Sequence, residues 1–433
     1  MDAMRLAACA LTFAISACSP WSGGAAFHCE TDAQCTGGPG AGRCEMLNGF
    51  CSFEDGECTS GQRYGSSSGS LSGVCVGEEP PIDAPLDITV DTPDGYIADA
   101  RQCFGTPINI CLTTVPLSPM NLPATINTDS GCTQVVTQVG GPDLCIVAAT
   151  TISVNGATHA VGSRPLVLVA TEALDVQNVL DASSTGGAAG AAANFGGCTV
   201  AQAGGDDTGG GAGGAGGGFQ AKGGDGGRGD ENNSGAPTGK ANGGVAGASQ
   251  TTAIIRGGCK GGDGGLAGGT RTVGANGGGA VYLIAGTSIT VGTNGGVFAA
   301  GGGGLLGDNC NGAGGGGSGG MIGFDAPTIT LTGKVAANGG GGGGGGGSGT
   351  AGGAGGDGTS TSFNTRAAAG TSGANNGPGN SGVGGLGSAI GNTTGGNGNN
   401  GDCGGGGGGG GVGFVWTHGT VTGNQISPAA TPK

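Results

Sequence analysis

The stretch AVYLIAGTSITV, residues 280–291, decides the fold, because it returns downstream as MIGFDAPTITL, residues 321–331. In both copies apolar residues alternate along two short runs, which is the pattern of strands with one buried face. Units that recur in this way cannot bury their apolar face alone, and they do so by stacking on one another. The best alignment pairs Val281 with Ile322, Leu283 with Phe324, Ile289 with Ile329, and Val291 with Leu331.

Related phrases occur at residues 144–154, 165–180 and 412–422. Each unit is short enough for one turn of a solenoid, in which alternate side chains point inward and the turns stack about 4.8 Å apart. Pro327 stands beside a strand, as expected at a corner where the strand ladder is interrupted. The sequence therefore predicts an all-β protein in which residues 103–433 form a right-handed parallel β-helix, a solenoid.

Glycine supplies 114 of the 433 residues and is concentrated in three blocks, 186–277, 301–318 and 339–410. The blocks have no strict G-X-Y period, which excludes collagen. Each block begins where one repeat unit ends and stops where the next begins, so we interpret all three as insertions from one corner of the solenoid. Two states compete for them. One is disorder, because glycine loses the most entropy on folding; the other is a bundle of extended helices with dihedrals like those of polyproline II. We expect partial order.

The N-terminal residues carry an export signal. Residues 6–14 form a short apolar run, which ends in Ile15-Ser16-Ala17-Cys18. This layout is typical of a bacterial lipobox, and the run is too short to span a bilayer. We expect residues 1–17 to be removed and Cys18 to carry the lipid that anchors the protein. An ordinary secretory signal with a chance cysteine is the alternative.

The remaining cysteines predict disulfides. Apart from Cys9 and Cys18 they fall into three groups with an even number in each, and an exported chain meets oxidising conditions. Zinc is not expected, because no C-x₂-C pair exists and the chain has three histidines. The candidate disulfide residues are Cys29, Cys35, Cys44, Cys51, Cys58, Cys75, Cys103, Cys111, Cys132, Cys145, Cys198, Cys259, Cys310 and Cys403.

The first hundred residues divide by composition. Residues 18–28 are a lipidated tether, and residues 29–75 are a Cys-rich module with few large apolar residues. Such a module needs disulfides to hold it, and it serves either as a spacer or as a binding head. Residues 76–102 combine prolines with aspartates, which predicts an extended acidic linker.

Several short motifs resemble functional sites without completing one. Asn127-Thr-Asp129, Asp206-Asp207 and His418 match fragments of the polygalacturonase active site, but not in that family's order. Residues 352–357 match the start of the calcium-binding RTX nonapeptide in a single copy. Arg228-Gly-Asp230 is an integrin-type tripeptide in a glycine tract. We therefore expect no catalytic residue, no metal site and no cofactor.

Five aromatic residues of the repeat body allow two interpretations. Most side chains of this kind on strands fill a core, whereas an outward subset would stack on sugar rings. The five are Tyr282, Phe298, Phe324, Phe414 and Trp416.

Taken together, these segments resemble bacterial surface lipoproteins in which a Cys-rich module precedes a Gly-rich, β-helix-like repeat body. Ser19 follows the lipidated position, where the pattern for inner-membrane retention favours Asp. The resemblance therefore implies the outer membrane or cell surface. The formal net charge of −15 argues against nucleic acid as a partner. The resemblance implies a lipid-anchored structural or adhesive protein without catalysis, with polysaccharide or extracellular matrix as candidate partners. A polysaccharide-active β-helix enzyme and a polyglycine ice- or surface-binding protein are the alternatives.

Overall fold

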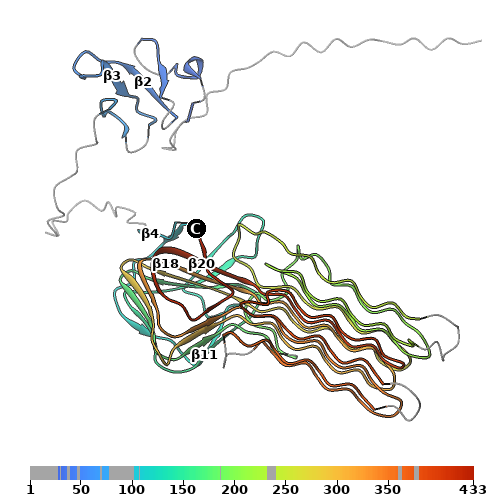
Figure 1. The fold of residues 1–433 in the computed structure, drawn as a ribbon. Helices are drawn as coiled ribbons and strands as arrows, with labels where there is room; N and C mark the ends of the chain where they lie inside the picture. The colour runs from blue at the N-terminus through green and yellow to red at the C-terminus, as the bar shows by residue number, and fades with distance from the viewer. Residues whose placement is uncertain are drawn as a thin grey trace, which may run out of the picture. The chain divides into compact units, whose positions relative to one another are not determined.

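The computed structural model describes residues 28–29, 31–36, 40–45, 49–68, 71–77, 102–106, 108–185, 187–231, 240–358, 363–374 and 380–433. The chain separates into two units, residues 1–96 and 97–433 (Figure 1). The expected signal peptide, Cys18 and residues 78–101 of the expected linker lie outside the described residues. Within those that are described, no α-helix is assigned and no helix has the length and apolar character that a membrane span requires.

The first unit is a small sheet held by disulfides. Strands β1 (Arg43–Glu45), β2 (Phe50–Glu54) and β3 (Gln62–Tyr64) pair antiparallel in that order, after a 3₁₀ turn at Asp32–Gln34. Its buried cluster contains four half-cystines and Phe53, so disulfides replace the large apolar side chains that a core would otherwise need.

The second unit is all-β and mostly parallel, as the repeats predict, and its strands form three ladders. The first consists of β9 (Leu144–Ala149), β12 (Leu166–Ala170), β15 (Ala280–Ala285) and the first halves of β18 (Met321–Leu331) and β20 (Phe414–Gly423), ending at β22 (Thr431–Pro432). The second consists of β6 (Met120–Asn121), β10 (Ile152–Val154), β13 (Ala173–Val176), β16 (Ser288–Val291) and the second halves of β18 and β20. The third consists of β7 (Thr125–Asn127), β11 (Thr158–Val161), β14 (Val179–Asp181), β17 (Gly296–Phe298), β19 (Lys334–Ala336) and β21 (Ile426–Ser427).

The register of the ladders is the one that the repeats predict. Val281 pairs with Ile322 and Leu283 with Phe324 in the first ladder, and the two predicted pairs of the second ladder are also present. These inward side chains belong to one continuous buried cluster. The register shifts between Asp325 and Thr328, at the bend that contains Pro327.

The outer face of the first ladder is also covered. Strand β8 (Gln134–Val136) pairs antiparallel with β9, while β4 (Gln102–Phe104) and β5 (Ile110–Leu112) form a hairpin. Ile110 and Leu112 of the hairpin belong to a second buried cluster with Tyr282 and Ile284 of β15. Side chains on both faces of the first ladder are therefore removed from water.

The glycine-rich blocks leave the ladders at equivalent places. They follow β14, β17 and β19 of the third ladder and return at β15, β18 and β20 of the first. In Figure 1 they extend from the strands as long segments lying side by side. Each of the three insertions thus connects a strand of the third ladder to the next strand of the first.

Disulfides join cysteines within each of the three groups. The bonds are Cys29–Cys44, Cys35–Cys51, Cys58–Cys75, Cys103–Cys111, Cys132–Cys145, Cys198–Cys259 and Cys310–Cys403. So many disulfides indicate an oxidising, extracytoplasmic environment.

Candidate functional site

The glycine-rich segments form a bundle held by backbone hydrogen bonds. Residues 404–413, the central segment, show its rule: every third N–H donates to the same neighbouring segment. The set beginning with Gly404 donates to residues 337–346, the set beginning with Gly405 to 211–217, and the set beginning with Gly406 to 393–399. A period of three without internal hydrogen bonds is the geometry of the polyproline II helix.

The carbonyl groups of the central segment bind a second set of neighbouring segments. They accept N–H groups from three further segments, residues 382–385, 313–319 and 220–227. The central segment therefore has six neighbours, three that it donates to and three that it accepts from. Residues 209–218, 311–320 and 339–347 are surrounded in the same way. This arrangement satisfies buried backbone groups that have no side-chain partners.

Glycine is required in the centre because the segments approach so closely. A Cβ atom added to Gly407 would overlap the carbonyl oxygen of Gly314, and one added to Gly408 would overlap that of Gly224. Of the two states that the sequence left open, the described part of the blocks adopts the extended, hydrogen-bonded one.

Outer segments carry side chains at every third residue. In residues 222–230 the outward positions are Lys222, Asp225 and Arg228. The N–H groups of Asp225 and Arg228 donate to side chains of the adjoining segment, residues 395–401, and to no backbone carbonyl of the described residues. Asn397 Oδ1 accepts the N–H of Asp225 at 2.9 Å, and Asn400 Oδ1 accepts that of Arg228 at 2.9 Å.

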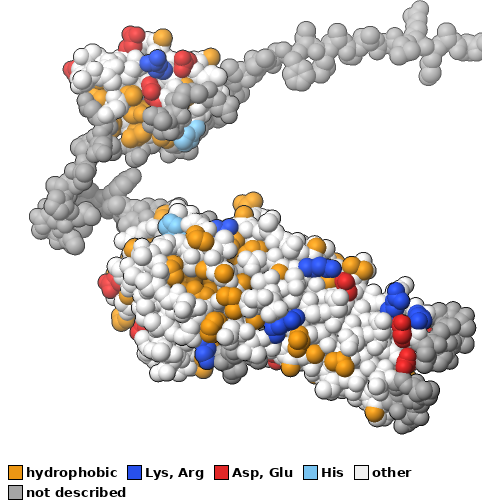
Figure 2. Space-filling view, in the orientation of Figure 1, with side chains coloured by type: hydrophobic (Ala, Val, Ile, Leu, Met, Phe, Trp, Pro, Cys, Tyr) orange, Lys and Arg blue, Asp and Glu red, His pale blue; other side chains and the backbone are white. Residues whose placement is uncertain are grey.

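Another side of the bundle carries uncharged side chains. Val383 and Leu386, three residues apart, are 38% and 44% exposed, and the adjoining segment presents Ala368, Thr371 and Ala374. Residues 382–387 and 367–373 are joined by hydrogen bonds between their backbones, so the two rows lie next to each other. Figure 2 shows the hydrophobic side chains on this unit as separate spots among polar side chains and backbone.

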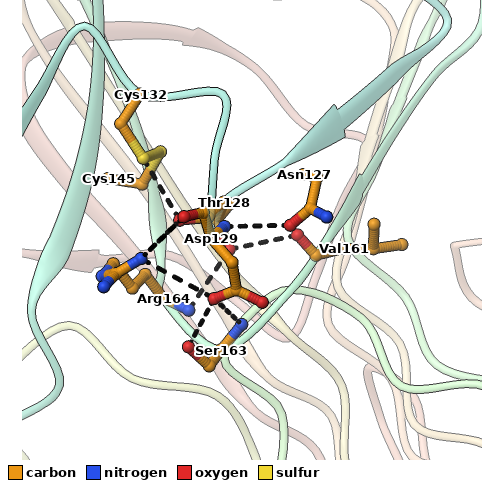
Figure 3. Close-up of polar contacts among 8 residues, drawn as sticks. All are labelled: Asn127, Thr128, Asp129, Cys132, Cys145, Val161, Ser163 and Arg164. Atoms are coloured by element: carbon orange, nitrogen blue, oxygen red, sulfur yellow. Dashed lines mark hydrogen bonds and ion pairs between the residues drawn. A yellow bond between two sulfur atoms is a disulfide. The ribbon is translucent and has the colours of Figure 1, made fainter.

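The Asn127-Thr-Asp129 motif builds a corner of the ladders (Figure 3). The Asp129 carboxylate accepts hydrogen bonds from the N–H and the hydroxyl of Ser163, at 2.9 and 2.5 Å. Arg164 donates to the Thr128 carbonyl, and Asn127 accepts the N–H of Asp129. The bonds from Ser163, with a smaller contribution from Arg164, lower the pKa of Asp129. The motif is structural here.

The other fragments of the polygalacturonase pattern do not come together around it. Asp206 forms an ion pair with Arg271 and accepts the N–H of Leu266, whereas Asp207 accepts the N–H of Gly209. His418 instead lies opposite Asp325 on neighbouring strands, with 2.9 Å between Nδ1 and Oδ1. The other carboxylate oxygen of Asp325 accepts the N–H of Thr106 at 2.7 Å.

The aspartates of the calcium-type and integrin-type motifs are also engaged or buried within the bundle. Asp357, the last residue of the RTX-like fragment, accepts the N–H of Gly303 at 2.7 Å. Asp230 of the Arg-Gly-Asp tripeptide is fully buried. Cys29, Cys35 and Cys44 bring three sulfur atoms together, but each is in a disulfide and offers no thiolate to a metal.

The five aromatic residues of the repeat body are core residues. None is more than 8% exposed: Tyr282, Phe298, Phe324, Phe414 and Trp416. Sugar stacking on these rings is therefore excluded. Burial, with a smaller effect of Asp325, raises the pKa of Tyr282, whose hydroxyl has no hydrogen-bond partner among the described residues.

Sequence reasoning missed the Asp325–His418 pair and the partly buried Phe104 beside it. The pair could have been found by extending the repeat alignment, because Met321 is aligned with Phe414 and the same register brings Asp325 to His418. No comparable signal marks Phe104, which reaches the site on the hairpin of β4 and β5.

Comparisons with known proteins add no assignment. No protein-family profile matches the chain, and neither characterised proteins nor solved structures give a significant match.

Proposed function

We propose that this chain is a lipid-anchored cell-surface protein of the outer membrane, whose right-handed parallel β-helix carries a rigid polyglycine bundle with a structural or adhesive role. The lipobox-like residues 15–18 support the anchor, and the disulfides support export. The three parallel ladders, with insertions at one corner, support the β-helix.

The observation that carries the role is the order of the bundle. A disordered glycine tract would be an elastic tether, whereas segments with six hydrogen-bonded neighbours form a stiff body. Its outer segments present side chains at fixed intervals of three residues, about 9 Å along a polyproline II helix. A stiff body with a regular surface is suited to scaffolding or adhesion.

Two measurements test this proposal. Hydrogen exchange on the full chain should show protected amides in residues 404–413, and fast exchange there would contradict a rigid bundle. Metabolic labelling with a fatty acid should mark the protein, and the labelled protein should be found in the membrane fraction. Replacing Cys18 by Ala should abolish the label, while Cys9→Ala is the matched control. A Cys18→Ala protein that still takes up label would contradict the anchor.

Ice or surface binding is a second candidate, favoured by the adjoining uncharged rows at residues 368–374 and 383–386. Thermal hysteresis of freezing by the purified protein would support it, and Thr371→Lys should then reduce the effect. Freezing without hysteresis would remove this candidate.

A further inference from the structure

Two adjoining cavities lie at the bend between the first and second ladders. One, of about 280 Å³, is lined by residues that include Phe104, Thr106, Asp325 and His418. The other, of about 550 Å³, is lined by residues that include Gln102, Phe104 and Thr171. Cys103, Phe104 and Gly286 line both, so the two cavities form one groove.

The groove crosses successive turns. Thr171 follows β12, Gly286 follows β15, and Pro327 and Gly419 lie in β18 and β20. Neighbouring strands of a sheet are about 4.8 Å apart, so four such strands span about 14 Å. The groove therefore suits an elongated ligand lying across the strands.

One polar group in the groove is held in a fixed orientation. The Asp325 carboxylate, 7% exposed, accepts a hydrogen bond from the Nδ1–H of His418, so that Nε2 is the acceptor when the ring is neutral. His418 is 37% exposed, and no atom of the described residues bonds Nε2. The hairpin supports this arrangement, since the backbone N–H of Thr106 donates to the carboxylate, and Gly105 allows the turn there, where a Cβ atom would overlap the carbonyl oxygen of Ile108.

Phe104 gives the groove an apolar wall. It is partly buried, unlike the aromatic residues of the core, and the disulfide Cys103–Cys111 holds its hairpin. Gln102 and Thr171 add an amide and a hydroxyl. Among the described residues that line either cavity there is no lysine or arginine, and the carboxylate of Asp325 is already engaged.

We infer that this groove binds a neutral oligosaccharide. An aromatic face and an imidazole acceptor match the apolar ring face and the hydroxyl donors of a sugar. The described lining residues carry no cationic side chain, which, in a protein of net charge −15, disfavours acidic chains. Asp325 is the one carboxylate among the described lining residues, and these do not supply the carboxylate pair that glycoside hydrolysis uses. The inference rests on the proposed adhesive function and names its ligand class.

Calorimetric titration of the detergent-solubilised full chain tests the inference. The probes are cello-, malto-, xylo- and manno-oligosaccharides, with oligogalacturonate as the acidic comparison. Phe104→Leu keeps apolar bulk without the ring. His418→Asn keeps a donor for Asp325 and removes Nε2. Each should weaken binding of the preferred neutral probe by about tenfold or more, the equivalent of about 1.4 kcal/mol.

His159→Asn is the matched control, because His159 is exposed and pairs with Asp181 on another ladder. It should bind as the wild type does. The inference is overturned if no neutral probe binds, if oligogalacturonate binds best, or if both groove variants keep full affinity. New reducing ends would overturn it as well, by making the groove a hydrolytic site. Fatty-acid labelling of the same preparations reports the anchor separately, so failure of the groove leaves the proposed anchoring intact.

Discussion

The N–H of Gly408 donates a 2.9 Å hydrogen bond to the carbonyl oxygen of Gly214, a residue from a different insertion. This contact repeats three residues earlier and three residues later along the same two segments. Between these hydrogen bonds the segments leave no room for a side chain, because a Cβ atom added to Gly213 would overlap the carbonyl oxygen of Gly406, and one added to Gly216 would overlap that of Gly409. The bundle is thus stabilised by backbone contacts that leave no room for a side chain at these glycines.

Gly408→Val should destabilise the protein strongly. The new Cβ would overlap the carbonyl oxygen of Gly224, and overpacking of this kind costs about 1–3 kcal/mol, with larger losses where the backbone cannot move. Urea unfolding followed by circular dichroism measures the change. Gly268→Ala is the control, because no atom lies within 4 Å of the added Cβ. Equal stability of the two variants would contradict the close packing.

Asn397→Ala should expose one backbone group at the bundle surface. Its side chain accepts the N–H of Asp225, and loss of such a bond costs about 1 kcal/mol. Hydrogen exchange should show a faster Asp225 amide in this variant. The control is Asn399→Ala, since no hydrogen bond of the Asn399 side chain is found in the described structure. An unchanged Asp225 amide would show that water already satisfies this position.

The ladders could be predicted because strand periodicity has a direct signature. Val281 and Ile322 occupy inward positions on neighbouring parallel strands, and alternation alone sets their register. The order of the bundle was harder to predict, because a run such as Gly339–Gly347 contains no side-chain pattern that would indicate a structure. The signal lay in the outer segments, where Lys222, Asp225 and Arg228 recur every three residues.

The groove was even harder to predict from the sequence. Phe104 reaches it through a hairpin whose placement depends on Ile110 and Leu112 packing on the outer face of β15. That contact joins segments far apart in sequence, and no local pattern encodes it. The sequence pattern points instead to the aromatic residues of the strands as candidate sugar-stacking residues, and these are buried in the structure.

Asp129→Asn should remove part of the acid sensitivity of the second unit. Hydrogen bonds from Ser163 lower the pKa of Asp129 in the folded chain below the unfolded value, which is about 3.9. The stabilisation from the charged form is therefore complete above about pH 4 and is lost as pH falls through the lower folded pKa. Melting temperatures from pH 6 to pH 2.5 should fall more steeply for the wild type than for the variant. Ser163→Ala should lie between them, and parallel profiles for all three would refute this account.

The Cys310–Cys403 disulfide should contribute more to stability than Cys103–Cys111. The first closes a separation of 93 residues and the second one of 8. Chain entropy then gives about 4–5 kcal/mol for the long loop and about 2–3 kcal/mol for the short one. Urea unfolding of the paired serine variants Cys310→Ser/Cys403→Ser and Cys103→Ser/Cys111→Ser compares them directly. A larger loss from the short loop would mean that contacts of the β4–β5 hairpin, rather than restriction of the unfolded chain, dominate the effect of these bonds.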